Sequence, residues 1–400
     1  MLIYIDVKDK KNRCRSRSAY NQIHINAYRK DPELIDEKLL KNEEKAIFSL
    51  RSLYKKYGYM PFKMSKFEEY DLYVRNKDFL VSDRIITFND TNGKLLALKP
   101  DVTLSVIKSG VDAPGCKQKV YYNENIYRVS GSTHQYTEIM QAGLECIGDI
   151  DLYDVFEAVH LAAQSLAMIA DEFVLEISHL GILSALLEEA GGSDSFRKAV
   201  AQCIAEKNEH DLARICEENG VSAEKTAKIC SFIGLYGDMK SVIEKLDKIC
   251  ETKCGRAALS ELCELQALIE TTEYADKVFL DFSIVNDMNY YNGIVFKGFI
   301  NGIYEGVLAG GRYDKLMEKM GRKSGAVGFA VYLDLLETLG TESSKYDVDV
   351  LLIYNEKTDV KVVADKVREL TEAGKSVSAQ KTIPGKLRYR ELINIEKEAR

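Results

Sequence analysis

Two Asn-Gly dipeptides constrain this chain more than any other feature of its sequence. Asn92-Gly93 divides the β-rich run RIITFNDTNGKLLALKP, and Asn301-Gly302 lies between the runs YYNGIVFKGFI and IYEGVLAGGRYDKL. An Asn-Gly pair supplies the positive φ angles that a tight hairpin turn requires. Each dipeptide therefore predicts a pair of antiparallel strands, and together they predict a sheet that is largely antiparallel.

Helices and a further hairpin are predicted around these strands. Residues 36–57 place apolar side chains at helical spacing, and Gly58 follows as a stop signal. A second helix is expected to begin after Pro100, in DVTLSVIKS. The runs QKVYYNENIYRV and EIMQAGLECIG predict a hairpin with a long loop between them, and GAVGFAVYLDLL predicts a strand with close-packing glycines that runs into an apolar helix.

The remaining segments predict how the chain is divided. Residues 181–275 have a helical pattern, and the C-terminal part alternates strand, helix up to Gly374, strand and a last helix, as a parallel α/β unit would. We therefore expect an α+β fold in four parts: a basic N-terminal extension (1–35), a sheet core flanked by helices (36–180 and 276–342), a helical insertion (181–275) and a partial α/β segment (345–400).

Composition excludes several classes of protein. A net charge of -7 argues against a protein that coats nucleic acid, and no run of ~18 apolar residues spans a membrane, so we expect a cytoplasmic protein. The first thirty residues hold eight Lys or Arg against two Asp; this basic arm could contact RNA, but a poorly ordered extension is favoured. Nine scattered cysteines predict no disulfide framework. Cys250, Cys254 and Cys263 are interpreted as structural, and no metal is expected.

Five segments together resemble a known family. LLALKPDVT, YRVSGSTHQYTEIMQAGLE, MNYYNGIVF, AGGRYDKL and GAVGFAVYLDLL are similar to the successive signature segments of histidyl-tRNA synthetase and its class II relatives. One such motif would be weak, but five in order are specific. The resemblance implies a class II synthetase-like fold with a six-stranded antiparallel sheet flanked by helices. It also implies a dimer formed through the early helix and strand, and a pocket for histidine beside ATP.

The resemblance also implies seven ligand-binding residues. By motif position these are Asp101 and Thr103 for the amino group, Arg128 for a carboxylate and phosphate, Gln141 and Glu145 along the amino-acid site, and Tyr291 and Tyr313 facing the ring. Such a pocket needs acceptors for an ammonium, a donor for a carboxylate and polar groups for the imidazole. Each residue taken alone also fits a structural role, such as a solvated hairpin arginine or a tyrosine in sheet packing. Their matched positions favour the pocket.

The same segments lack the positive charge that adenylation requires. Leu335 occupies the position where the synthetase has an arginine that grips the ATP phosphates, Asn286 replaces a second arginine, and SGSTHQY replaces an arginine-rich loop. Removing one preorganised donor can slow such a reaction about 100 to 1,000-fold. We therefore expect no catalytic residue, no adenylation and no cofactor.

These departures, the retained Asp101 and the short C-terminal segment resemble the regulatory subunits of ATP phosphoribosyltransferase, a family of synthetase-like partners of the short-form catalytic subunit in histidine biosynthesis. The resemblance implies a non-catalytic protein that is required for the activity of its partner, self-associates as a dimer and takes part in histidine feedback. No nucleic-acid or membrane partner is expected. Two other classes stay open: an active or diverged histidyl-tRNA synthetase, and a free-standing amino-acid-binding protein.

Overall fold

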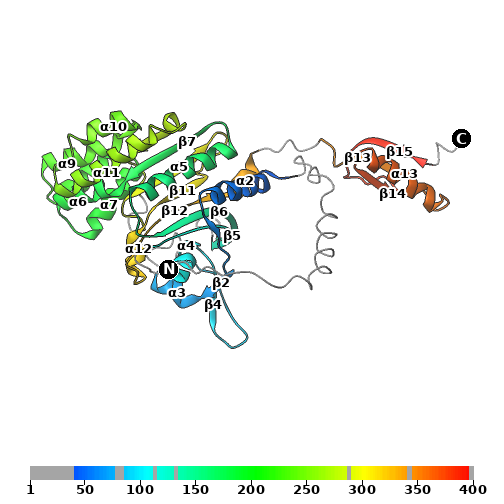
Figure 1. Cartoon of the computed structure of the whole chain (residues 1–400), viewed down its shortest axis with the longest axis horizontal. Helices are drawn as coiled ribbons and strands as arrows, with labels where there is room; N and C mark the ends of the chain where they lie inside the picture. The colour runs from blue at the N-terminus through cyan, green and yellow to red at the C-terminus, as the bar shows by residue number, and fades with distance from the viewer. Residues whose placement is uncertain are drawn as a thin grey trace, which may run out of the picture. The chain divides into compact units, whose positions relative to one another are not determined.

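The computed structural model of the protein describes residues 40–76, 85–110, 115–129, 134–285, 290–339 and 345–395. These residues form two compact units, which divide between Leu339 and Gly340 (Figure 1). The predicted basic extension (1–35) lies outside the described residues. No helix in the described part of the chain is long and apolar enough to cross a membrane.

The first unit is built on one large sheet, which has nine strands within the described residues. In spatial order they are β1 (Met60–Pro61), β5 (Lys117–Val129), β6 (Tyr136–Gly148), β12 (Gly325–Tyr332), β11 (Leu308–Arg312), β10 (Ile294–Ile300), β7 (Phe173–His179), β9 (Val278–Asp281) and β8 (Tyr236–Asp238). The six strands from β5 to β7 pair antiparallel, which confirms the central prediction. The structure extends that sheet with β1, parallel to β5, and with β9, parallel to β7.

Both Asn-Gly turns are confirmed. Gly93 (φ 79°) joins β3 (Thr87–Asn89) to β4 (Leu95–Leu98), and these strands form a small separate sheet with β2 (Phe67–Glu69). Gly302 (φ 90°) lies between β10 and β11. Glycine adopts these left-handed angles without the steric penalty of a Cβ.

The two faces of the sheet pack against different helices because successive side chains of a strand point to opposite sides. Leu144 and Phe329 on one face join a core with α2 (Asn42–Lys56) and α5 (Leu152–Ile169). Ile147 on the other face joins a second core with α4 (Thr103–Ser109), near α3 (Tyr70–Arg75) and α12 (Asp314–Lys319). The side that faces α4 is called the α4 face below.

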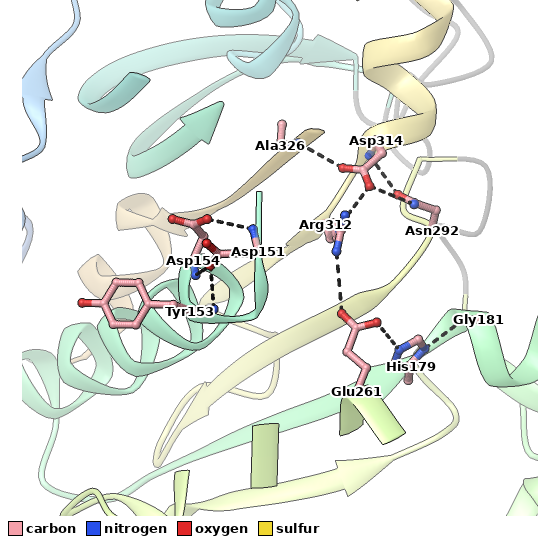
Figure 2. Close-up of polar contacts among 10 residues, drawn as sticks. All are labelled: Asp151, Tyr153, Asp154, His179, Gly181, Glu261, Asn292, Arg312, Asp314 and Ala326. Carbon is pink, nitrogen blue, oxygen red and sulfur yellow. Dashed lines mark hydrogen bonds and ion pairs between the residues drawn. The ribbon is translucent and has the colours of Figure 1, made fainter. Parts of the chain in front are cut away.

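Polar contacts fix the start of α5. The Asp151 carboxylate accepts hydrogen bonds from the N–H groups of Tyr153 (2.9 Å) and Asp154 (3.2 Å), and the Asp154 carboxylate accepts from the Asp151 N–H (2.9 Å) (Figure 2). This reciprocal capping satisfies donors that a helix leaves unpaired at its first turn. Lys117 on β5 lies 2.6 Å from Asp154, so the capped end is also attached to the sheet.

The helical segment contains α6 (Leu180–Ala190), α7 (Asp194–Ala205), α8 (Glu209–Glu218), α9 (Ala223–Cys230), α10 (Met239–Leu246) and α11 (Lys253–Ile269), with 3-10 turns η3 (Ser231–Gly234) and η4 (Ala275–Lys277). Figure 1 shows its labelled helices grouped at one end of the first unit. There α10 contacts β8 and β9, and α11 contacts α5 and α6. The predicted helices are present, and their status as an insertion stays a prediction.

The second unit corrects one prediction. It contains β13 (Val348–Ile353), α13 (Val360–Glu372), β14 (Val377–Gln380) and β15 (Tyr389–Asn394), and its parallel sheet has the order β14-β13-β15. The predicted last helix is therefore wrong, because residues 389–394 form a strand. This segment is rich in charged residues that favour helices, and they obscure its strand-like alternation. In the structure, Ile393 lies in the core beside Leu352.

Candidate functional site

Glu145 is the centre of a buried polar cluster on the α4 face. It lies in β6 with 2% of its surface exposed. Its Oε1 accepts a hydrogen bond from Thr103 Oγ1 (2.7 Å), and its Oε2 accepts one from the Tyr313 hydroxyl. Gly328 is its partner on the adjacent strand β12, and a Cβ there would lie 1.8 Å from Glu145 Oε2. The glycine therefore provides the room that the carboxylate occupies.

Burial dominates the electrostatics of Glu145. It raises the pKa of the carboxyl to about 8, although the hydrogen bonds from Tyr313 and Thr103 act to lower it and the nearby Asp101 adds a further rise. Burial also raises the pKa of Asp101, against the opposing effects of the Leu104 N–H and the Arg128 guanidinium. Two carboxyl groups with raised pKa values favour the arrival of a cation, because a positive group nearby stabilises their ionised forms.

Asp101 belongs to the cluster and also stabilises the start of α4. Its Oδ1 accepts a hydrogen bond from the Leu104 N–H (3.0 Å) at the start of α4. Arg128 Nε donates to the carbonyl of Pro100, the preceding residue (3.1 Å). Arg128 thus lies at the Asp101 end of the cluster, where an arginine can bind a carboxylate.

Three phenol rings border the cluster. The rings of Tyr291 and Tyr313 lie 6.5 Å apart, and Tyr290 lies 4.7 Å from the first and 5.8 Å from the second. Burial raises the pKa of Tyr290, and the carboxylates of Asp101 and Glu145 add to the rise. Sequence reasoning missed Tyr290. The adjacent pair Tyr290-Tyr291 was the available signal. In a regular strand, however, neighbouring side chains point to opposite faces, which would have placed only one of the two rings at the site.

Gln141 shares the α4 face but lies farther along the strand. It is 4% exposed, and its backbone partners are Glu124 on β5 and Tyr332 on β12. Four residues of strand place it about 14 Å from Glu145. Lys99, which sequence reasoning also missed, is fully buried with Nζ 3.0 Å from Glu124 Oε2. All seven predicted residues therefore lie on the α4 face of the sheet or at its border. Gln141 lies well away from Glu145.

The sequence lacks an expected positive charge at three places, and of these the structure describes only Leu335 completely. Leu335 lies in the 3-10 turn η5 (Leu333–Thr338) and packs against the core on the α2 and α5 side of the sheet. Asn286 and residues 130–133 lie outside the described residues. Leu335 therefore gives an apolar contact where the resemblance implies a phosphate-binding cation.

The cysteines interpreted as structural differ in exposure. Cys250 is buried and Cys254 is exposed. Within the described ranges, no group of three or more His, Cys, Asp or Glu side chains could hold a metal ion.

The fold is of the class II synthetase type, and the model of the histidyl-tRNA synthetase family matches residues 35–336. An ATP phosphoribosyltransferase regulatory subunit from Oceanobacillus iheyensis is 30% identical over 334 residues, which cover 82% of this chain and 81% of that one. The chain belongs to the family of ATP phosphoribosyltransferase regulatory subunits, and its role in histidine biosynthesis is regulatory.

Two solved structures show the same fold. A crystal structure of an ATP phosphoribosyltransferase regulatory subunit/histidyl-tRNA synthetase from Bacillus halodurans has a TM-score of 0.72 at 24% identity, covering 88% of this chain and 93% of that chain. A chain of the ATP phosphoribosyl transferase complex from Thermotoga maritima has a TM-score of 0.58 at 20% identity, covering 75% of this chain and 98% of its own.

Proposed function

We propose that this chain binds histidine at the Glu145 cluster and reports it to a short-form ATP phosphoribosyltransferase catalytic subunit in the cytoplasm, without catalysis of its own. The observation that carries the proposal is the buried set of Glu145, Thr103 and Tyr313 beside Asp101, while the partly buried Leu335 packs against the core. Carboxylates and hydroxyls match an ammonium and an imidazole, and Arg128 matches a carboxylate. A synthetase-like site that has lost its catalytic cations but kept its amino-acid-binding groups fits this cluster.

The family and two exposed apolar side chains support the proposed partners. A similar fold occurs in the ATP phosphoribosyl transferase complex named above, which supports a catalytic partner for this chain. Phe48 on α2 (54% exposed) and Met60 on β1 (66% exposed) support self-association through the early helix and strand. An apolar side chain on an edge strand such as β1 favours pairing with a second chain.

The purified protein should catalyse neither histidine-dependent pyrophosphate exchange nor tRNA charging. The physical reason is the missing cation at Leu335 and, by the resemblance, at Asn286, since nucleotidyl transfer depends on positioned positive charge. An active histidyl-tRNA synthetase in the same assay is the positive control. Exchange above background would contradict the regulatory proposal and favour the synthetase alternative.

Asp101→Asn should move histidine inhibition of the reconstituted phosphoribosyltransferase to higher histidine by about 10 to 100-fold, because a charge-assisted contact is worth about 1.5 to 3 kcal/mol. Asparagine keeps the acceptor for the Leu104 N–H, so α4 retains its first hydrogen bond. Asp101→Ala would lose both.

The matched control is Asp90→Asn. Asp90 Oδ1 accepts from the N–H groups of Asn92 and Lys94 in the β3–β4 turn (2.8 Å each), so this variant also changes an acid to an amide at a turn. Its inhibition curve should match that of the wild type. If Asp101→Asn assembles normally and its curve is also unchanged, feedback is sensed elsewhere. Histidine binding without any effect on the phosphoribosyltransferase would favour a free-standing binding protein.

A further inference from the structure

A chain of polar contacts connects the helical segment to the strand end beside the Glu145 cluster (Figure 2). Glu261 on α11 contacts His179 Nε2 through Oε2 (3.4 Å) and Arg312 Nη1 through Oε1 (3.7 Å). Arg312, the last residue of β11, contacts Asp314 Oδ2 through Nε at 2.7 Å. One arginine is thus shared between a carboxylate of the helical segment and the Asp314 carboxylate at the start of α12.

The Asp314 end of this chain is held by hydrogen bonds to two other segments, one to a backbone N–H group and one to a side-chain amide. Asp314 Oδ1 accepts from the Ala326 N–H at the start of β12 (3.1 Å), and the Asp314 N–H donates to Asn292 Oδ1 (2.8 Å). A Cβ on Gly325 would lie 2.7 Å from Asp314 Oδ1, so the glycine leaves room for the carboxylate. The Asn292 N–H also donates to the carbonyl of Arg312 (3.1 Å). Asp314 therefore has one well-defined position.

The His179 end is held by α6. His179 Nδ1 accepts a hydrogen bond from the Gly181 N–H (3.1 Å), which caps the start of that helix. In a neutral imidazole the proton must then lie on Nε2, where it can be donated to Glu261. His179 and Arg312 together lower the pKa of Glu261, first through the His179 hydrogen bond, against the effect of burial. Glu261 is thus held as a carboxylate between the His179 imidazole, with which it shares a hydrogen bond, and the Arg312 guanidinium, with which it forms an ion pair.

The chain of contacts lies next to two of the tyrosines that border the Glu145 cluster. Tyr313 lies between Arg312 and Asp314 in the sequence, and its hydroxyl donates to Glu145. Its N–H donates to the carbonyl of Ala326 (2.9 Å). Tyr291 directly precedes Asn292. The Arg312–Asp314 contact therefore fixes the backbone from which Tyr313 reaches the Glu145 carboxylate.

We propose that Glu261 is a positioning residue for the pocket, which acts through Arg312 to hold the Tyr313 hydroxyl on Glu145. The helical segment thereby sets the affinity of the pocket for its ligand. Without the Glu261 charge, Arg312 keeps Asp314 as its one ionic partner among the residues that the structure describes, and it gains freedom to move. The identity of the ligand as histidine rests on the proposed function above, but the coupling between Glu261 and Tyr313 does not.

The first test uses the ligand-free full-length protein labelled with 3-fluorotyrosine. The chain has 23 tyrosines, and the fluorine resonance that disappears in Tyr313→Phe is that of Tyr313. This resonance should shift in Glu261→Gln, and should shift less in Glu261→Asp, which keeps the charge. It should stay in place in Glu264→Gln, which removes a charge from the same helix at a side chain that contacts Ser260. A Tyr313 resonance that is unmoved in Glu261→Gln overturns the proposal.

The second test measures histidine binding by calorimetry. Glu261→Gln should weaken binding by about 3 to 10-fold, within the range of moderate coupling energies, and Glu264→Gln should leave it unchanged. In a Tyr313→Phe background the effect of Glu261→Gln should almost disappear, because two changes along one route are not additive. Equal losses in both backgrounds overturn the route through Tyr313. If the wild type binds no histidine, the proposed function fails, while the fluorine resonance still decides the role of Glu261.

Discussion

Gly328→Ala should destabilise the first unit by at least about 3 kcal/mol, at the upper end of the range for overpacked sites. The added Cβ would lie 1.8 Å from Glu145 Oε2 and 2.4 Å from the carbonyl oxygen of Leu144. The Glu145 side chain is held by two hydrogen bonds, and the Leu144 carbonyl belongs to the backbone of the paired strand β6. Neither group can move without losing hydrogen bonds, either those of the Glu145 side chain or those between the paired strands. Urea denaturation followed by circular dichroism measures the change.

Two further variants make this result specific. Gly306→Ala places a Cβ at an ordinary 3.6 Å from its nearest neighbour, and its free energy of unfolding should stay within about 0.5 kcal/mol of the wild-type value. The double variant Gly328→Ala with Glu145→Ala should recover part of the lost stability, because only the contact with the Leu144 carbonyl remains. An unchanged midpoint for Gly328→Ala alone would contradict the packing described for this pair of strands.

The second large effect is that the free energy of unfolding should depend on pH because of the Glu145 carboxyl. The folded-state pKa of about 8 lies above the ordinary value of 4.5. Folded protein therefore holds this proton more tightly than unfolded protein does between the two values. The resulting stabilisation is complete below about pH 4.5 and is lost as the pH rises through about 8, with a total of up to about 5 kcal/mol.

Glu145→Gln isolates this contribution, because the amide cannot titrate, while its oxygen still accepts from one of the two hydroxyls and its NH2 group donates to the other. The free energy of unfolding, measured in urea at intervals from pH 5 to pH 8, should fall more steeply in the wild type than in the variant. Other titrating groups are common to both proteins and cancel in the comparison. Parallel curves would show that the Glu145 carboxyl is ionised throughout this range.

Sequence reasoning succeeded where local chemistry determines the backbone. The turns at Gly93 and Gly302 and the helix stop at Gly58 each depend on a left-handed residue, and glycine marks such positions directly. The family resemblance added what local chemistry could not, since it named Thr103, Glu145 and Tyr313 before any contact between them was visible. The structure joins these three by hydrogen bonds.

Sequence reasoning failed where distant segments decide the outcome. Tyr389–Asn394 become β15 because β13 offers a pairing edge, a property of the folded unit and not of the six residues. The contact of Glu261 with Arg312 joins a helix to a strand end through tertiary packing, and neither motif nor period indicates it. The same is true of Lys99, which looks like a surface lysine in sequence and is fully buried beside Glu124.

The position of β12 in the sheet has a consequence for synthesis of the chain. β12 pairs with β6 on one side and β11 on the other, yet β6 ends at Gly148 and β12 begins only at Gly325. At typical ribosomal speeds, β6 waits on the order of ten to thirty seconds for this neighbour to emerge. During that time it presents an open, largely apolar edge, which is a template for pairing between nascent chains. Expression at high ribosome density therefore exposes this fold to aggregation before it is complete, and chaperone binding to the nascent chain protects it.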